Sequence, residues 1–420
     1  MIVRRISLLV VVLTLFMPVA RAQQEAGQLP EVLTMPALLR LVAERSPRLA
    51  VERTAIDAAE ADRVTAGALL NPTISYGSSR PSGGAANAVI NGNRQQQAGI
   101  DLPVLIAGQR SARVEAAEQG VLGARARVVQ AASEMVLRAA ELFAGLQAAQ
   151  EKIAVLGEAY GEIERAASLI SGRLESGMAS RYDLARVEIE VAGIAVRLAE
   201  ARADAAEKSA GIAALLGAPG WRPRAGGELA PKGLQVELPV WQASLVSGNA
   251  QIAAARRDED TARAAVRRSE LDRWPVPVLS LSRTWTSEPF GAANFIGFST
   301  EVPLFDSRRG QLDKAQADLR AAERRRQALE AETGVELGRL LEALSQRRAA
   351  LERFERKVDV RSPALRQMAE DAYRLGRGTV LELIDAARTR VDARVTGIDL
   401  RAFTVQQELR ILALTGRLGV

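Results

Sequence analysis

The chain contains an internal duplication, and this feature limits its possible folds more than any other. The two copies lie 199 or 200 residues apart, and their landmarks keep the same order. We therefore expect two copies of one unit, at residues 23–217 and 238–420, joined by a linker rich in Gly and Pro at residues 218–237. The matching landmarks are Asp101-Leu102-Pro103 with Glu301-Val302-Pro303, Gly177-x-x-Ser180-x-x-Asp183 with Gly376-x-x-Thr379-x-x-Glu382, and Leu216-Gly217 with Thr415-Gly416.

The first 22 residues have the three parts of a secretory signal peptide. Arg4 and Arg5 are basic, residues 6–20 are apolar, and Ala20-Arg21-Ala22 is a typical cleavage site. The apolar stretch is shorter than the ~20 residues that a membrane-spanning helix needs. We expect residues 1–22 to be removed on export, which lowers the formal net charge from +6 to +3.

The sequence has no cysteine and no histidine. Their absence excludes thiol nucleophiles, histidine acid–base chemistry and most zinc sites. No paired-carboxylate or phosphate-loop motif stands out, so we expect no enzyme, no cofactor and no metal site. The arginines alternate with Glu and Asp, as in residues 311–332. This pattern is typical of solvated helix faces and does not indicate nucleic-acid binding.

Each half contains a long heptad pattern. In the first half it runs unbroken from Val128 to Leu174, and a continuous helix from Ala107 to Leu174 would be roughly 100 Å long. In the second half the pattern runs from Leu337 to Leu375, with Arg347 and Arg361 as polar interruptions. A strict 3.5-residue spacing indicates coiled-coil packing, so we assign these apolar residues to the core.

A tight turn follows each long helix. Ser180 with Asp183, and Thr379 with Glu382, have the spacing of capping boxes that begin a return helix. The glycine before each box suits the end of a helix. We therefore expect an antiparallel helical hairpin in each half, preceded by a shorter helical stretch at residues 35–70 and 238–273.

Each half also has two candidate strands between its short and long helices, with alternating apolar and small or polar residues. No later segment is apolar for about 18 residues, so entry into a membrane would require strands closed into a barrel. Four strands are too few to close one, which implies several chains. The alternative is a soluble antiparallel sheet packed on the helices. The expected strands are Thr73–Ser79, Gln95–Leu102, Val278–Thr286 and Phe295–Val302, and the aromatic residues that could form an interfacial girdle are Trp274, Trp285, Phe290, Phe295, Phe298 and Phe305.

The chain resembles the TolC-type outer-membrane efflux proteins over nearly its whole mature length. The resemblance rests on the duplication, the Pro-containing openings of the long helices and the two turns. The stretches that carry it are Leu70-Asn71-Pro72, Asp101-Leu102-Pro103, Glu301-Val302-Pro303-Leu304-Phe305, Pro363, Tyr373-Arg374-Leu375-Gly376 and Asp385-Ala386.

This resemblance implies a mostly α-helical chain with a small β part, and a homotrimer with a 12-stranded membrane barrel continued by a periplasmic helical barrel. It also implies a passive duct in the outer membrane of a Gram-negative bacterium, in contact with outer-membrane lipid, a periplasmic adaptor and an inner-membrane pump. The turns would meet the adaptor through Gly177, Ser180, Gly376 and Thr379. Gate carboxylates would correspond to Asp183, Glu382 and Asp385. Asp183 and Glu382 have a competing role as capping acids, whereas Asp385 lies deeper in its helix.

The entry to the first strand, Ala66-Gly67-Ala68-Leu69-Leu70-Asn71-Pro72, resembles the heavy-metal (CzcC-like) branch most closely. It implies export of heavy-metal cations. Two alternatives remain: the same channel serving drug efflux or type I protein secretion, and a soluble periplasmic coiled-coil adaptor.

Overall fold

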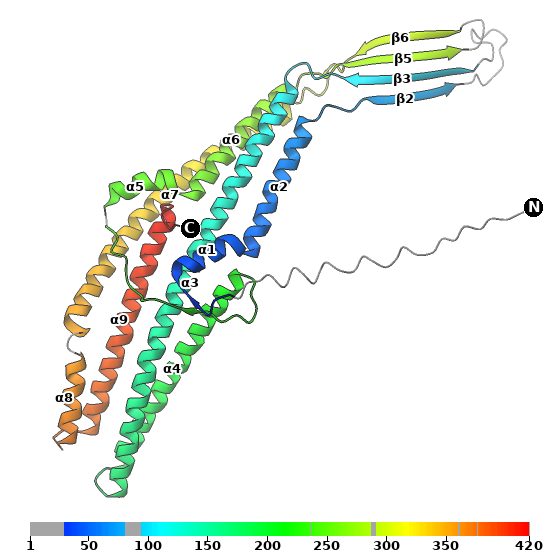
Figure 1. Ribbon diagram of the computed structural model, residues 1–420. Helices are drawn as coiled ribbons and strands as arrows, with labels where there is room; N and C mark the ends of the chain where they lie inside the picture. The colour runs from blue at the N-terminus through cyan, green and yellow to red at the C-terminus, as the bar shows by residue number, and fades with distance from the viewer. Residues whose placement is uncertain are drawn as a thin grey trace, which may run out of the picture.

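The computed structural model describes residues 29–79, 94–235, 237–286, 291–359, 362–375 and 377–419. The molecule is long and narrow, with a small sheet at one end and helices that run to the other end (Figure 1). The predicted signal peptide at residues 1–22, the aromatic residue Phe290 and the turn residue Gly376 lie outside the described residues.

Both halves have the same order of elements: two short helices, two strands, a long helix and a return helix. The first half comprises β1 (Val32–Leu33), α1 (Met35–Arg45), α2 (Pro47–Gly67), β2 (Thr73–Ser79), β3 (Gln95–Pro103), α3 (Gln109–Glu175) and α4 (Arg181–Leu215). The second comprises β4 (Arg224–Ala225), α5 (Leu238–Gly248), α6 (Ala250–Leu271), β5 (Val278–Thr286), β6 (Ala292–Ser299), α7 (Arg309–Phe354), the π-helical turn η1 (Glu355–Asp359), α8 (Ser362–Arg374) and α9 (Val380–Leu414).

The short helical stretch expected in each half is two helices rather than one. In the first half the break falls at Ser46, whose extended backbone precedes Pro47 at the start of α2. Proline disfavours the helical conformation of the residue before it, which explains the break. In the second half Asn249 ends α5 and caps α6, because its side chain accepts a 2.8 Å hydrogen bond from the N–H of Ile252.

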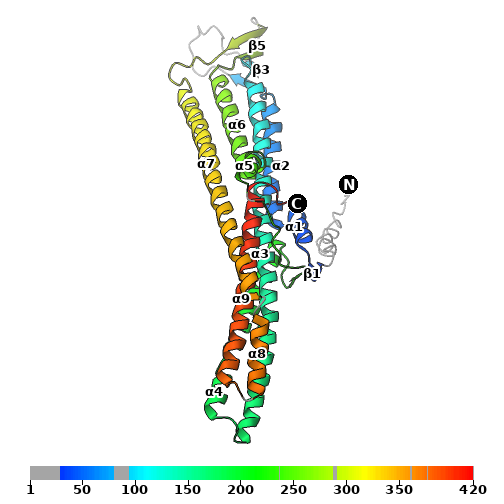
Figure 2. The same cartoon turned by 90° about the vertical axis from the view of Figure 1, so that its left-hand side faces the viewer.

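The helices form two sections that share α3. Near the sheet, neighbouring helices pack in the order α2, α3, α6, α7, and near the turns in the order α4, α3, α9, α8 (Figures 1 and 2). The expected long helix is confirmed, since α3 is unbroken over 67 residues, which corresponds to about 100 Å. None of the helices in the described ranges is both long and apolar enough to cross a membrane.

The heptad residues of α3 form the core, as predicted. None of them is exposed, and half are fully buried between α3 and its neighbours. Burial of a large apolar side chain stabilises a fold by about 1.5–3 kcal/mol, so this seam is a major source of cohesion. The fully buried members are Met135, Ala139, Leu146, Ala149, Leu156, Ile163 and Ile170.

The second long helix differs from its predicted form. It is interrupted by the π-helical turn η1, and α8 begins at Ser362, immediately before Pro363. The predicted effect of Pro363 fits this break, since proline cannot donate a helical hydrogen bond and its ring clashes with the preceding turn. The heptad prediction also fails at the end of the second long helix, where Met368 in α8 and Leu375 just after it are 67% and 70% exposed. No element of the described chain covers this part of α8.

The linker between the two halves crosses the middle of the helices. Its strand β4 pairs in parallel with β1, and the amide of Gln147 on α3 donates to the carbonyl oxygens of Gly226 and Gly227. The carboxylate of Glu408 on α9 accepts hydrogen bonds from three linker N–H groups, those of residues 232–234, and an ion pair from Arg348. Glu408 is only 1% exposed, so these bonds fix the linker to the helices.

The four longer strands form one antiparallel sheet in the order β2, β3, β5, β6. The central pair β3–β5 joins the two halves. Three strands lie within a residue of their predicted bounds, whereas β6 occupies Ala292–Ser299 instead of residues 295–302. Pairing between β5 and β6 stops where Val278 meets Ser299. The reason is that Pro275 and Pro277, just before β5, have no N–H to continue the ladder.

Candidate functional site

The sheet has two chemically different faces. One face carries large apolar side chains from all four strands, and the opposite face carries mainly small and polar residues, as the alternation predicted. The apolar face is not covered by any described element, and Ile74, Ile296 and Phe298 on it are 70–80% exposed. Apolar patches of this kind mark contact with a membrane or another protein. The apolar-face residues are Ile74, Tyr76, Ala98, Ile100, Leu102, Leu279, Leu281, Trp285, Ile296 and Phe298.

The predicted aromatic residues divide between these surfaces. Trp285 and Phe298 lie on the apolar face, while Trp274 and Phe305 flank the sheet where it meets the helices, and both are exposed. Phe295 lies on the opposite face, because it pairs with Ser282 across the β5–β6 ladder. A single girdle therefore does not include Phe295.

The first turn, at the far end from the sheet, is built as predicted. Gly177 has a left-handed backbone with φ of +73°, which suits glycine. The N–H of Met178 bonds to the carbonyl of Arg173, and that of Gly177 bonds to the carbonyl of Leu174. This pair of bonds is a Schellman motif, which closes α3 before the chain turns back into α4.

Both predicted capping boxes are present. Ser180 accepts from the N–H of Asp183, and Asp183 returns a bond to the Ser180 N–H at 3.1 Å. Thr379 and Glu382 make the same two bonds at the start of α9, with a 2.8 Å bond from the Thr379 N–H to the Glu382 carboxylate. The two turns therefore share one local chemistry.

The three predicted gate carboxylates lie near these turns but differ in their contacts. Asp183 is half-buried and its Oδ2 also accepts a 2.7 Å bond from the Ser180 hydroxyl. Glu382 is exposed and holds its cap. Asp385 is exposed one helical turn further along α9, with no hydrogen bond or ion pair to the described residues. Asp385 is thus the carboxylate of the three with no structural task in the described chain.

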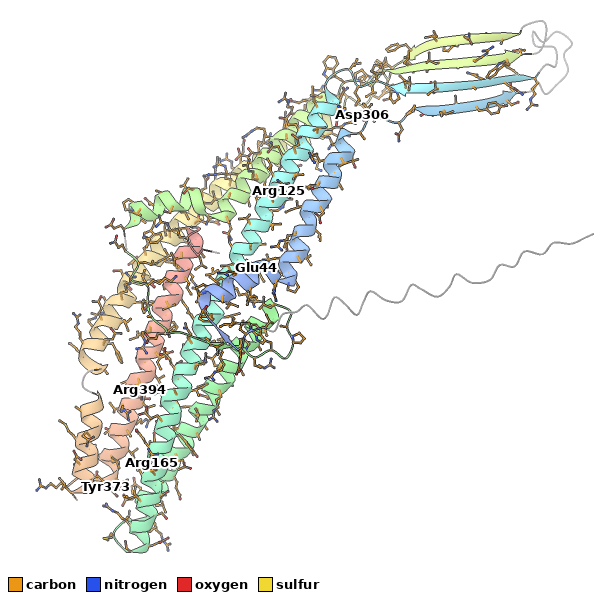
Figure 3. The ribbon with its side chains drawn as sticks, viewed as in Figure 1. Glu44, Arg125, Arg165, Asp306, Tyr373 and Arg394 are labelled. Carbon is orange, nitrogen blue, oxygen red and sulfur yellow. The ribbon has the colours of Figure 1, made fainter. Side chains whose placement is uncertain are left out.

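A row of ion pairs joins α3 to α9, and sequence reasoning did not find it. Glu158 on α3 pairs with Arg390 and Arg394 on α9, and Arg390 also reaches Glu162 at 2.9 Å. Figure 3 labels Arg394 in this row. Hydrogen bonds from Arg394 and then Arg390 lower the pKa of Glu158, against the opposing effect of burial. The further pairs toward the middle of the molecule are Lys152–Asp399, Glu151–Arg401 and Glu141–Arg410.

The predicted signature residue Tyr373 has a packing role beside the turns. Tyr373 (labelled in Figure 3) is 9% exposed, and the guanidinium of Arg173 on α3 lies 4.7 Å from the ring centroid. Tyr373 and Arg173 line a cavity of about 320 Å³ between α3, α8 and α9. The contact therefore links the ends of the two hairpins by a cation–π interaction. Within the described ranges, no three acidic side chains gather closely enough to hold a metal ion.

Comparison with known proteins agrees with this architecture. The family model "Outer membrane efflux protein" matches residues 38–218. The cobalt-zinc-cadmium resistance protein CzcC of Cupriavidus metallidurans is 25% identical over 396 residues, which cover 92% of this chain and 90% of that protein. The nickel-cobalt-cadmium resistance protein NccC of Alcaligenes xylosoxydans xylosoxydans is 26% identical over 304 residues, 69% of this chain and 65% of that protein.

Solved structures of the same shape include CusC, with a TM-score of 0.76 at 17% identity over 91% of this chain and 92% of that chain. The outer membrane protein VceC of Vibrio cholerae has a TM-score of 0.73 at 18% identity over 91% of this chain and 96% of that chain. These likenesses show that the fold is that of TolC-type channels. With the sequence matches, they show that the chain is similar to outer membrane efflux proteins, which are channels of the outer membrane that extend into the periplasm.

Proposed function

We propose that three copies of this chain form an outer-membrane duct that carries heavy-metal cations out of the cell. The main support for a membrane channel is the exposed apolar face of the sheet. The sheet lies at one end of a helical body about 100 Å long. A soluble adaptor would have to leave this face in water, which is unfavourable. The family is one of transport channels, which fits the expectation that the chain is not an enzyme.

The arrangement of the strands supports closure by several copies. The outer strands β2 and β6 each leave one edge unpaired, and they run in opposite directions. The β6 edge of one copy can therefore pair with the β2 edge of the next copy and keep the sheet antiparallel. Three copies would supply twelve strands, an even number as expected for a bacterial membrane barrel.

The helical edges support the same closure. On α4, a second heptad seam faces away from α3, and its large members Tyr182, Ile189 and Val196 are 59–73% exposed. On the opposite edge, Met368 in α8 and Leu375 just after it are exposed. Seams spaced by seven residues normally pack against another helix. We infer that the α4 edge of one copy packs against the α8 edge of its neighbour. The remaining seam residues of α4 are Ala185, Ala192 and Ala199.

The turns would form the periplasmic end, where an adaptor and an inner-membrane pump deliver the cargo. We propose that the adaptor contacts Gly177, Ser180 and Thr379, together with Gly376. We also propose that Asp183, Glu382 and Asp385 line the gate. A ring of carboxylates favours cations and disfavours anions. Asp385 is the strongest of the three candidates, since the other two already hold their caps.

The proposed cargo rests on the sequence relatives, which are named for resistance to cobalt, zinc, nickel and cadmium. The chain needs no metal ligands for this role, because a wide aqueous duct conducts ions without binding them tightly. We also propose that residues 1–22 are an export signal, and that residues 23–217 and 238–420 are two efflux repeats joined by 218–237.

The first test is to express the full-length chain in a Gram-negative host that lacks its own channels of this family, and to fractionate the envelope. We expect a detergent-extracted trimer in the outer-membrane fraction. Co-expression with a cognate metal pump and adaptor should raise tolerance to cadmium or cobalt, with a drug pump as the matched control. Extraction without detergent would contradict the channel, while tolerance to drugs alone would contradict only the cargo.

The gate is tested by Asp385→Asn, which removes the charge and keeps the shape. We expect a lower cation-to-anion permeability ratio in single-channel recordings, with an unchanged trimer. Glu188→Gln is a matched control, because it too removes a charge and keeps the shape, and Glu188 is exposed on the return helix of the other hairpin. An unchanged permeability ratio in Asp385→Asn would remove Asp385 from the gate.

A further inference from the structure

The apolar face of the sheet changes in character from its base to its tip. Strand pairing divides it into rows that run across the sheet. The two rows nearest the helices are wholly apolar, and the next row outward combines Tyr76, Ala98, Arg283 and Asn294. Beyond it lies a row with Ser78, Gln96 and Trp285. The two apolar rows are Leu102, Leu279 and Phe298, and then Ile74, Ile100, Leu281 and Ile296.

Arg283 is an isolated cation on this face. It is exposed, and no carboxylate in the described part of the chain lies within ion-pair distance of it. Its guanidinium lies 5.7 Å from the ring centroid of Trp285, which is within the range of a cation–π interaction. The acidic residue of the sheet, Asp101, points to the opposite face and bonds to Ser280. The five N–H donors of Arg283 therefore have no anionic partner within the described protein.

The position of Arg283 agrees with the depth of a lipid headgroup. Trp274 and Trp285 are both exposed; Trp285 lies near the outer end of β5, and Trp274 precedes the strand on the side of the helices. At about 3.3 Å per residue and a tilt near 45°, the stretch from Val278 to Trp285 rises roughly 16 Å along the membrane normal, so Trp285 lies toward the outer limit of the ~25 Å apolar band of such barrels. Arg283 lies one row inside Trp285. Long cationic side chains at this depth extend to the interface and meet phosphates there.

The row offers more than one donor to a phosphate. The hydroxyl of Tyr76 and the amide of Asn294 lie in the same row as Arg283, and both side chains are exposed. Neighbouring strands are about 4.8 Å apart, so Asn294 is adjacent to Arg283 and Tyr76 lies two strands away. Guanidinium groups bind phosphate through two parallel hydrogen bonds, and neutral donors beside them add to the binding.

We propose that Arg283, supported by Trp285, Asn294 and Tyr76, binds the phosphate of an anionic lipid in the outer leaflet of the outer membrane. The two apolar rows below it would contact the acyl chains of the same lipid. Because the apolar rows adjoin the cation, the surface fits a lipid, which has both acyl chains and a phosphate. A free phosphate would make no contact with the apolar rows. The inference rests on the proposed function, because it requires the sheet to face the bilayer.

The test uses the full-length protein purified in detergent and exposed to phosphatidylglycerol and phosphatidylcholine with matched acyl chains. Native mass spectrometry then gives the ratio of the two lipids retained. We expect the wild type to prefer phosphatidylglycerol. Arg283→Gln should lower this ratio about fivefold, which is the usual contribution of one arginine to binding at an anionic surface. Arg283→Lys should keep most of the preference, and Trp285→Ala should lower it less than Arg283→Gln does.

Arg320→Gln is the matched control, because it removes one exposed arginine from α7, away from the sheet. It should leave the lipid ratio unchanged, and every variant should migrate as the same oligomer as the wild type. A ratio that is equal in Arg283→Gln and the wild type would overturn the lipid site and leave the channel intact. A protein that extracts without detergent and retains neither lipid would overturn both proposals.

Discussion

The two hairpins of this chain begin from the same turn chemistry and differ in their long helices. The first has an unbroken α3 of 67 residues, whereas the second is divided into α7, a π-helical turn and α8. This difference between the two long helices follows from how many neighbouring helices each one has. Helix α3 packs against α2, α4, α6 and α9, while α7 and α8 lie at the edge. A central helix is held straight by its neighbours, and an edge helix is free to bend toward whatever covers it.

The return helices differ as well, at positions that correspond through the duplication. Ser209 on α4 donates a 3.0 Å bond to the carbonyl of Pro223, at the start of the linker. Glu408, which lies 199 residues later, holds the end of the linker through its carboxylate. One linker is therefore held from both repeats, by a neutral group in one and by a buried charge in the other.

The largest effect is expected at Glu408. Glu408→Ala removes the carboxylate that pairs with Arg348 and that accepts from three linker N–H groups. Breaking a buried ion pair costs about 3–5 kcal/mol. The corresponding change Ser209→Ala removes one neutral hydrogen bond and should cost about 1 kcal/mol. Hydrogen exchange of the amides at residues 232–234 measures the local cost. Equal exchange in the two variants would show that the linker is held by other contacts.

The next effect concerns the break in the second long helix. Glu164 is the position in α3 that corresponds to Pro363, so Glu164→Pro places the same interruption in the central helix. We expect a loss of about 3 kcal/mol, because α3 cannot bend away from its neighbours. Glu164→Ala is the control for the lost 3.2 Å bond from Tyr160. Pro363→Ala should instead be tolerated, and thermal unfolding of the purified protein compares the three variants.

A smaller and equal effect is expected at the two capping boxes. Ser180→Ala and Thr379→Ala each remove an acceptor for one N–H at the start of a return helix, which costs about 1 kcal/mol. Limited proteolysis at the turns provides the measurement. Because the boxes make the same bonds, the two rates of cleavage should rise by similar factors. A much larger rise in one variant would show that its turn carries strain that the other lacks.

The smallest effect is the pH dependence of the α3–α9 contact. The pKa of Glu158 is lowered in the folded protein, so its ion pairs contribute stability above the unfolded glutamate pKa of about 4.3. This contribution is lost as the pH falls from that value through the lowered folded pKa. Hydrogen exchange in the half of α9 nearest the turn should therefore rise below about pH 4 in the wild type. Glu158→Gln should show the faster exchange at neutral pH and a flatter profile.

The sequence predicted those parts of the fold that depend on local physics. The heptad seam predicted α3, the capping boxes predicted both turns, and the alternation predicted the two faces of the sheet. Periodicity and capping act within a few residues, so they can be read without knowing what lies nearby.

The features that were missed depend on contacts between distant segments. The ion pairs between α3 and α9 join residues more than 200 positions apart, such as Glu158 and Arg390, and each charge alone looks like part of a solvated face. The exposure of Met368 was also missed, since a heptad pattern does not say whether its partner belongs to the same chain. The gate role of Asp385 and the contacts of the turns with an adaptor stay predictions, because they concern molecules outside this chain.

The pairing of β3 with β5 has a consequence for symmetry. Each repeat supplies two adjacent strands and one hairpin, and the seam of the duplication runs through the middle of the sheet. In the proposed threefold ring, the six repeats would therefore stand about 60° apart, in quasi-equivalent positions. At the capped turns, where the two repeats have the same local structure, the ring would have approximate sixfold symmetry. At η1 and Glu408, where the repeats differ, its symmetry would be only threefold. A protein that binds at the turns would find six nearly equal sites on the ring. A protein that binds at the interrupted helices would find three.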